Sequence, residues 1–232
     1  MRTFISLLLA LFTGASLNAQ SDSTALKKKN PVVFSPGFGL GFGGGMKGAT
    51  AQLSYHFKKE LSLRAEINGL TIEDLTVDLV FSGQTLRTVG NLELLNTSLI
   101  LDYFPNYEYS SFHFFAGISY AVNNRMQGRG LYPEAVEYGE LTFEGEEIGY
   151  VDVQMITNTW MPQMGIGFGR SRPKRKAGVR FEIGTYYWGA PQIKMEATRM
   201  LENTAQEASK LEDNLSQYRW LPFMNIALNF RL

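Results

Sequence analysis

The sequence has no cysteine, no formal net charge and no apolar run long enough for a membrane helix. Its 232 residues contain Cys 0, which excludes disulfides, thiolate chemistry and the lipidated cysteine of a bacterial lipoprotein. Lys and Arg together number 22, as do Asp and Glu, so bulk charge gives no indication of a nucleic-acid partner. A transmembrane helix needs about 20 consecutive apolar residues, and no stretch reaches that length.

Glycine and aromatic residues are abundant instead. The chain contains Gly 23, Phe 16, Tyr 11 and Trp 3, while charged residues make up 19% and concentrate between apolar segments. This length suits one β-domain of barrel size. If the chain crosses a membrane, it must do so as a closed β-barrel, because a barrel satisfies its own backbone hydrogen bonds in lipid.

The N-terminus has the composition of a targeting segment. Arg2 precedes the short apolar stretch 4–12, and Ala19 provides a small residue at a cleavage position. This order predicts a cleaved signal peptide over residues 1–19, with an uncleaved anchor as the alternative. We expect residues 20–30 to be a flexible lead-in and residues 31–232 to form the barrel domain.

Alternation of apolar and polar residues recurs along the rest of the chain. Period 2 indicates strands with two different faces. In each strand the apolar face carries no charge, whereas a water-soluble β-protein would place charges on its outer face. The pattern therefore predicts an all-β, up-and-down antiparallel transmembrane barrel of about eight strands. The predicted strands are 33–42, 49–57, 61–69, 95–104, 112–120, 161–169, 177–187 and 220–232.

The connections between these strands alternate in length. Those after the second, fourth and sixth strands are short, and those after the third, fifth and seventh are long. Outer-membrane barrels have short periplasmic turns and long extracellular loops. We therefore expect both termini in the periplasm and a hairpin over residues 75–94 that extends outside the cell. Residues 43–45, three glycines, are expected to form the first turn, which is short for an external loop.

These features resemble the small outer-membrane barrels of the OmpA and opacity-protein type. The resemblance rests on the signal peptide, the even number of strands, the Gly-X-Gly-X-Gly runs at 37–41 and 165–169, and the closing strand 220–232. In that family the closing strand usually ends in an aromatic residue that the barrel-assembly machinery reads. Here the chain ends in Leu232. The resemblance implies that the outward face of this strand carries the assembly signal, namely Trp220, Met224, Ile226, Leu228, Phe230 and Leu232.

Charged residues on the small, polar faces are the candidate functional residues. Eight strands leave an interior just wide enough for side chains, and charges there must pair. We expect a salt-bridge network that plugs the lumen; a gate or narrow ion path is the alternative. A His113–carboxylate pair suggests acid–base chemistry, but no nucleophile lies at a fixed spacing, so we expect no catalysis, cofactor or metal. The predicted lumen residues are Arg64, Glu66, Asp102, His113, Arg180, Glu182 and Arg231.

Three connecting segments have compositions of their own. The acidic residues in 134–152 suit Ca²⁺ but match no EF-hand spacing, so a solvated loop with a hairpin near Glu144 is the favoured interpretation. Residues 204–218 repeat leucine and alanine at helical spacing after a capping box at Thr204, which predicts a loop helix. The basic segment 170–176 is expected in a periplasmic turn, where contact with anionic head groups is more plausible than nucleic acid.

Together these features favour an outer-membrane barrel with a structural or surface-interaction role. Its expected partners are outer-membrane lipid, the assembly machinery and an extracellular ligand bound through the loops. A small gated pore is the main alternative. A lipid-modifying enzyme would need clustered polar residues on the outer face near one rim, and the sequence shows none.

Overall fold

The computed structural model describes residues 34–81, 84–131, 136–138 and 141–232. The expected signal peptide and lead-in lie outside these residues. None of the helices within the described ranges is long and apolar enough to cross a membrane.

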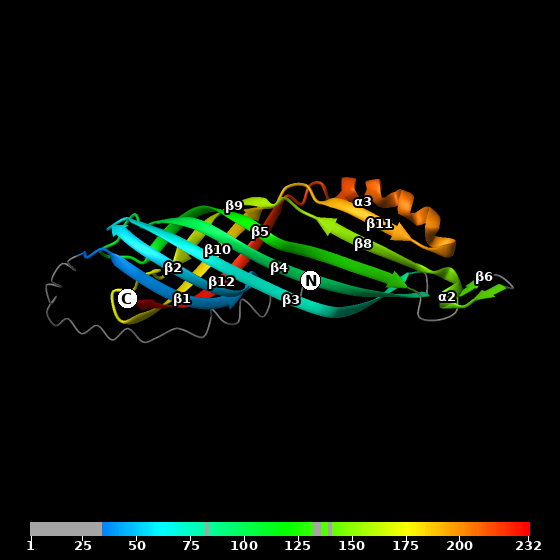
Figure 1. The fold of residues 1–232 in the computed structure, drawn as a ribbon, viewed down its shortest axis with the longest axis horizontal. Coiled ribbons are helices and arrows are strands. Elements are labelled where there is room, and N and C mark those ends of the chain that lie inside the picture. The colour runs from blue at the N-terminus through cyan, green and yellow to red at the C-terminus, as the bar shows by residue number, and fades with distance from the viewer. Residues whose placement is uncertain (1–33, 82–83, 132–135, 139–140) are drawn as a thin grey trace, which may run out of the picture. The chain divides into compact units, whose positions relative to one another are not determined.

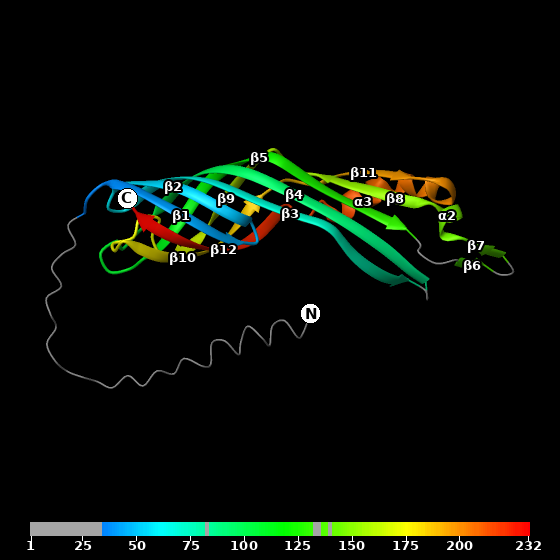
Figure 2. The same ribbon diagram turned by 60° about the horizontal axis from the view of Figure 1, so that its bottom comes forward.

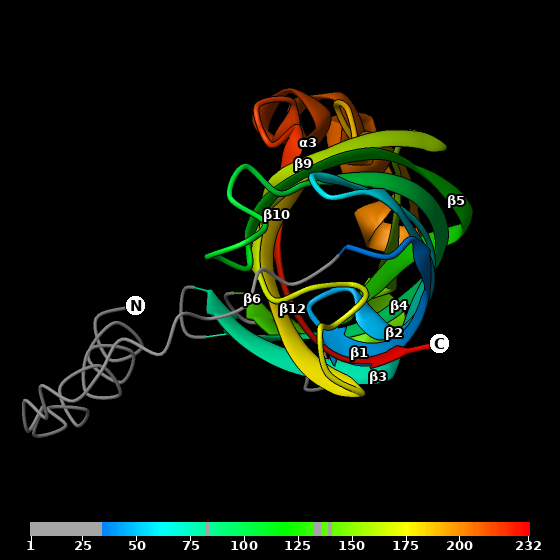
Figure 3. The ribbon, with the colours of Figure 1, turned by 90° about the vertical axis from the view of Figure 1, so that its left-hand side faces the viewer.

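Eight antiparallel strands close into a ring, as the end-on view in Figure 3 shows. Consecutive strands pair with their neighbours, β5 pairs with β9, and β1 pairs with β12 to complete the circle. The all-β barrel predicted from the sequence is therefore confirmed. The ring strands are β1 (Gly37–Gly45), β2 (Gly48–Lys58), β3 (Leu61–Phe81), β4 (Gln84–Tyr103), β5 (Phe112–Leu131), β9 (Trp160–Phe168), β10 (Ala177–Tyr187) and β12 (Trp220–Arg231).

The first predicted turn is misplaced: the sequence predicts it at residues 43–45, and it lies at 46–47. The three glycines at 43–45 belong to β1, where they pair with both β2 and β12, and the turn consists of Met46 and Lys47. An ideal Cβ on Gly43 would lie 2.2 Å from the Ile226 carbonyl oxygen, so close strand packing requires glycine there. A glycine run indicates a turn in isolation, but the neighbouring backbone explains it here.

Within the ring, apolar side chains face outward and polar side chains face inward. The side chains of Leu99 and Ile226 are 52% and 56% exposed, whereas Arg64 and Arg180 are 0% and 1% exposed. This arrangement is the reverse of a water-soluble barrel. It follows directly from the period-2 alternation in the sequence.

Beyond the ring, β3, β4 and β5 continue as a twisted sheet, which we call the extension (Figures 1 and 2). Two further strands widen this sheet beside β5, in the order β5–β8–β11. A separate two-stranded hairpin and three short helices make up the remaining elements of the described residues. These elements are β6 (Val136–Tyr138), β7 (Leu141–Phe143), α2 (Gly145–Ile148), β8 (Tyr150–Ile156), β11 (Gln192–Ala197), η1 (Arg199–Glu207) and α3 (Ala208–Leu215).

The two faces exchange their polarity where the strands leave the ring. In β4 the inward face carries Asp102 and Asn96 within the ring but Leu94 and Leu92 in the extension. The outward face changes in the opposite sense, from Leu99 to Glu93 and Asn91. An irregularity in register between β4 and β5 lies at this level, next to Leu95 and Asn96. The exchange indicates that the ring and the extension have different surroundings.

The predicted loop helix is displaced and is partly of another type. A 3-10 helix occupies Arg199–Glu207, and the α-helix covers only Ala208–Leu215. The segment starts early because Thr198 is anchored to Tyr150 of β8: the Tyr150 amide donates to the Thr198 hydroxyl and the Thr198 amide donates to the Tyr150 carbonyl. The side chains of the proposed capping box lie outside the described set.

The expected hairpin near Glu144 is also wrong. The hairpin formed by β6 and β7 lies earlier, and Gly145–Ile148 is one helical turn. The amide of Glu147 donates to the carbonyl of Glu144, which begins that turn. A glycine after an acidic residue suits either structure, so the local sequence could not separate them.

Candidate functional site

The centre of the barrel lumen is the guanidinium of Arg64 on β3. Its Nη1 donates to Glu66 at 2.9 Å, to Glu182 at 3.2 Å and to the side-chain oxygen of Gln52 at 3.1 Å. Its Nη2 donates to Asp102 at 3.0 Å and to Glu182 at 2.9 Å. One arginine therefore joins carboxylates from β3, β4 and β10 across the interior.

Arg180 and His113 complete the connections around Glu182. Arg180 donates to Gln52, and its Nε lies 3.5 Å from Glu182. The Nη1 atom of Arg180 lies 3.8 Å from Asp102. On the other side of Glu182, the Nε2 atom of His113 lies within hydrogen-bond distance, at 3.3 Å. Glu182 is thus shared by two arginines and one histidine.

Lys47, in the first turn, is a member of this group that the sequence analysis missed. Its ammonium donates to Glu66, and its side chain is 1% exposed. The turn places Lys47 over the end of the lumen, and no periodic pattern covers a two-residue turn. We call the linked charged groups the luminal network. It consists of three cationic and three anionic side chains, Lys47, Arg64, Arg180, Glu66, Asp102 and Glu182.

Arg231 does not belong to the luminal network, contrary to the prediction. Its side chain is exposed and donates weakly to the carbonyl of Lys174 at 3.4 Å, in the turn between β9 and β10. The alternation of β12 does place Asn229 inward, where its side-chain oxygen accepts from Gln52. Arg231 has the same parity but lies at the last strand residue, where the ring no longer encloses it.

Inward glycines provide the space that the network occupies. A Cβ on Gly167 would lie 2.6 Å from the His113 ring and 2.9 Å from Cγ of Glu182. A Cβ on Gly41 would lie 2.1 Å from the Asn229 side-chain oxygen. The Gly-X-Gly-X-Gly runs therefore have a physical role, since an eight-stranded ring has little room for long side chains on every strand.

The end of the lumen near the short turns is filled by aromatic rings. Phe104 is fully buried and stacks on His56 with ring centroids 5.4 Å apart. Tyr107, from the turn after β4, packs edge-on against His56. Arg170 lies over the Tyr107 ring at 4.2 Å and donates to the carbonyls of Tyr107 and Ser110. Burial lowers the pKa of the Arg170 guanidinium, and the electrostatic interaction with Tyr107 partly offsets this effect.

An apolar layer covers the network on the side of the extension. Phe115 and Phe223 lie 6.1 Å apart, and Tyr186 lies 4.7 Å from Phe223. Lys47 sits 4.7 Å above the Phe223 ring and so joins the two layers. The charged network is therefore enclosed between aromatic and apolar side chains. The apolar layer consists of Ile100, Phe115, Met161, Tyr186 and Phe223.

Three potential metal ligands, two of them in the luminal network, lie close together. One donor atom each from Asp102, His113 and Glu182 lies within 4.8 Å of the others. Both carboxylates already accept hydrogen bonds from Arg64, whose guanidinium occupies the cation position between them. This group of atoms favours an internal salt bridge over a metal ion.

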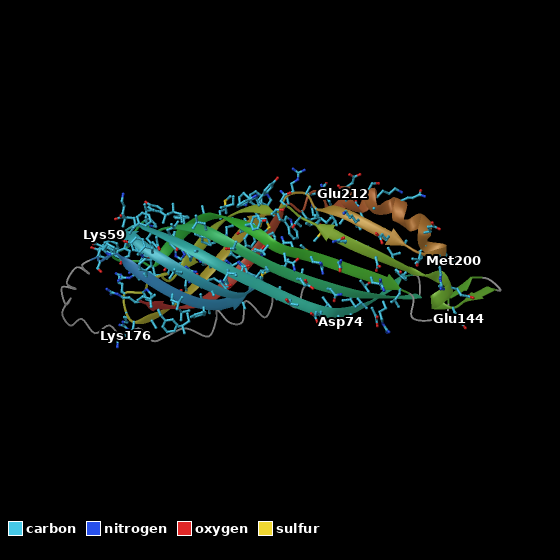
Figure 4. The ribbon with its side chains drawn as sticks, viewed as in Figure 1. Lys59, Asp74, Glu144, Lys176, Met200 and Glu212 are labelled. Carbon is cyan, nitrogen blue, oxygen red and sulfur yellow. The ribbon has the colours of Figure 1, made fainter. Side chains whose placement is uncertain are left out.

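The described residues of the predicted acidic segment 134–152 and the basic segment 170–176 lie at opposite ends of the barrel and its extension. In the acidic segment, Asp152 lies on β8 and forms a paired contact with Arg129, while Glu134 and Glu140 lie outside the described residues. In the basic segment, Lys176 marks the turn end of the ring in Figure 4, together with Lys59. Glu144 and Met200 mark the opposite end, on the extension.

The closing strand presents its apolar face away from the lumen. These side chains pack on neighbouring outward residues; for example, Trp220 lies 5.0 Å from Tyr187. Their fractional exposures range from 37% for Phe230 to 66% for Leu232. The outward residues are Trp220, Met224, Ile226, Leu228, Phe230 and Leu232.

The fold is shared with known β-barrel structures. The crystal structure of CarO from Acinetobacter baumannii is 21% identical over 85% of this chain and 98% of its own, with a TM-score of 0.57. That of CarO2 from the same organism is 19% identical, covers 86% and 100% of the two chains and has a TM-score of 0.59. No protein-family model matches the chain, and no curated protein matches it. These similarities show the fold, that of an outer-membrane β-barrel, and the narrower OmpA and opacity type stays a prediction.

Proposed function

We propose that the protein resides in a bacterial outer membrane, where the ring spans the bilayer and the extension lies outside the cell. The outward apolar face of the ring and the fold shared with outer-membrane barrels support this location. Aromatic pairs such as Tyr120 with Trp160 and Tyr187 with Trp220 lie where the strands leave the ring. Such rings are enriched at membrane interfaces.

The role that the geometry supports best is a structural or surface-interaction role without conduction. The observation that carries this proposal is the luminal network, in which equal numbers of cationic and anionic groups fill the interior between two layers of rings. A water-filled ion path requires charged side chains to face water. Here the side chains of Arg64, Asp102 and Glu66 are each 0% exposed.

The extension provides the surface for interaction. Its outward face contains a depression of about 540 Å³ that extends over β4, β5, β8 and β11. The charges on this face alternate in sign, as Arg129 pairs with Asp152 at 2.6 Å. A partner that docks there would have to match a mixed polar surface. The polar lining is Asn91, Gln127, Arg129, Asp152, Gln154, Lys194 and Glu196.

Recording in planar bilayers tests the sealed lumen. We expect no steady conductance from the purified protein and the same result for Glu182→Gln. Steady channels in the wild type that are lost in Glu182→Gln would overturn the proposal and support a small pore. Migration on a gel with and without heating establishes that the recorded sample is a folded barrel.

The absence of cysteine allows a direct test of location and orientation. Ser209→Cys on α3 and Lys59→Cys in the turn after β2 both introduce an exposed thiol. A membrane-impermeant maleimide applied to intact cells should label Ser209→Cys and not Lys59→Cys, and both variants should be labelled after lysis. Labelling of Lys59→Cys alone in intact cells would reverse the orientation, and fractionation of both variants outside the membrane would reject the location.

A further inference from the structure

A cavity opens above the apolar layer, at the mouth of the barrel. Its volume is about 190 Å³, and β3, β4, β5, β9, β10 and β12 all contribute to its wall. Lys47 and Asn96 lie at its lower end, next to the luminal network. The walls are otherwise mostly apolar. The apolar lining includes Leu92, Leu94, Met126, Trp188 and Phe223.

This cavity continues into an apolar trough along the inward face of the extension. The trough has a volume of about 280 Å³ and includes Ile72, Leu75 and Met155. Leu92 and Met126 line both the cavity and the trough. The continuous surface leads from the open sheet to the closed end beside Asn96, so its shape suits a chain-like ligand.

The side-chain oxygens of Asn96 and Asn124 in the cavity wall have no hydrogen-bond partner in the structure. Asn96 is 6% exposed; its amide nitrogen donates to Asn68 at 3.4 Å, and its oxygen is unpaired. The amide nitrogen of Asn124 donates to Thr157 at 3.3 Å, and its oxygen is also unpaired. A buried acceptor without a donor is energetically unfavourable, so a ligand that donates hydrogen bonds to these oxygens is favoured.

We propose that this cavity binds a neutral amphiphile, with its alkyl or acyl chain along the trough and an uncharged donor, such as a hydroxyl, at the asparagine oxygens. The apolar walls fit the chain. The polar end must be neutral because the luminal network already balances its charges, so a further buried charge would lack a counter-ion. The cavity is smaller than the usual pocket of about 300–1,000 Å³ for drug-sized ligands, which favours one narrow chain.

Tryptophan fluorescence provides a local readout, because the chain has Trp 3 and only Trp188 lines the cavity. In a Trp160→Phe, Trp220→Phe variant, Trp188 is the single reporter. The probe is 12-bromododecan-1-ol, added to the folded protein in phospholipid vesicles. We expect saturable quenching of Trp188. A matched variant that retains only Trp220, which faces outward and is 50% exposed, should show quenching that rises in proportion to probe in the bilayer.

Variants that retain Trp188 as the single tryptophan distinguish binding in the cavity from partitioning of the probe into the membrane. Leu94→Phe narrows the cavity and should shift saturation to at least tenfold higher probe concentration, whereas Leu95→Phe, on the outward face of the same strand, should leave it unchanged. Asn96→Leu removes an acceptor and should weaken bromododecanol binding by about 5- to 10-fold, equivalent to roughly 1–1.4 kcal/mol. Gel migration with and without heating verifies that each variant is folded.

The head-group requirement has its own test. 11-Bromoundecanoate in its charged form should bind at least about tenfold more weakly than the alcohol, because its charge would be buried without a partner. Equal binding of the two probes would overturn the neutral-ligand assignment. Quenching of Trp188 that fails to saturate, or that Leu94→Phe leaves unchanged, would overturn the site itself.

Discussion

The ring and the extension share three strands, β3, β4 and β5, yet the two regions bury opposite kinds of side chain. In β3, Arg64 and Glu66 face inward within the ring, and Ile72 continues that face in the extension. The ring therefore encloses charge and exposes apolar groups, while the extension exposes Thr71 and Glu73 on its outward face. The backbone pairing continues through both regions, so surroundings rather than strand geometry select the residues.

Ion pairs are buried in the ring and exposed in the extension. Arg64 and Asp102 are 0% exposed on both side chains, whereas Arg129 and Asp152 in the extension are 51% and 35% exposed. Desolvated charges depend on every partner, because each lost partner leaves an uncompensated charge. Exposed pairs contribute roughly 0–1 kcal/mol and are screened by salt. The comparison predicts graded effects for equivalent changes in the two regions.

The largest effect is expected for Arg64→Met. This change removes the cation that joins three carboxylates, and the loss of one partner from a buried network costs about 3–5 kcal/mol. Equilibrium unfolding in urea, with the protein in lipid vesicles, measures it. The control Arg87→Met removes an arginine that pairs with Asp78 in the extension, and the cost there should stay below about 1 kcal/mol. If Arg64→Met and Arg87→Met lower the free energy of unfolding equally, the inferred difference between buried pairs in the ring and exposed pairs in the extension is wrong.

Lysine substitutions on the outward face should distinguish the part of a strand that contacts lipid from the part that contacts water. Ala65 and Thr71 both face outward on β3, one within the ring and the other in the extension. Ala65→Lys should lower the free energy of unfolding in vesicles by about 2–4 kcal/mol, and Thr71→Lys by nearly nothing. If Thr71→Lys is as costly as Ala65→Lys, the membrane boundary that we infer from the polarity exchange is wrong.

A smaller effect is expected for Ile193→Val on the inward face of β11. Ile193 is 8% exposed and its backbone amide donates to Glu212 of α3. Loss of one buried methyl group costs about 0.5–1.5 kcal/mol. Hydrogen exchange should show faster opening of β8, β11 and α3 and unchanged protection in the ring. The control Lys194→Ala faces outward and should leave exchange in both regions unaltered; faster exchange throughout the ring would show that the two regions unfold together.

The smallest effect is expected for Asp152→Asn, which weakens the exposed pair with Arg129. The free energy of unfolding of the extension should fall by less than about 1 kcal/mol in low salt. At 1 M salt, where the Debye length is about 3 Å, the difference from the wild type should disappear. A difference that persists in high salt would mean that this pair is shielded from solvent.

Much of the ring could be predicted because apolar and polar residues alternate with period 2 within each of its strands. The inward placement of Arg64, Asp102 and Glu182 follows from parity alone. The exchange of polarity was also present in the sequence, since Leu94 and Leu95 are adjacent apolar residues at the point where the alternation changes phase. Lys47 and Arg231 could not be assigned in this way, because a turn has no period and a strand end has no enclosing neighbours.

The sequence by itself determined that the chain forms strands with an apolar face free of charge, because alternation is a local property that neighbouring residues encode. Only the tertiary structure decided which charges meet. Lys47 in the first turn reaches Glu66 on β3, and Glu182 on β10 meets Arg64 on β3, far apart in the chain. Ring closure brings these groups together, and the cavity above them exists only because six strands contribute to its wall.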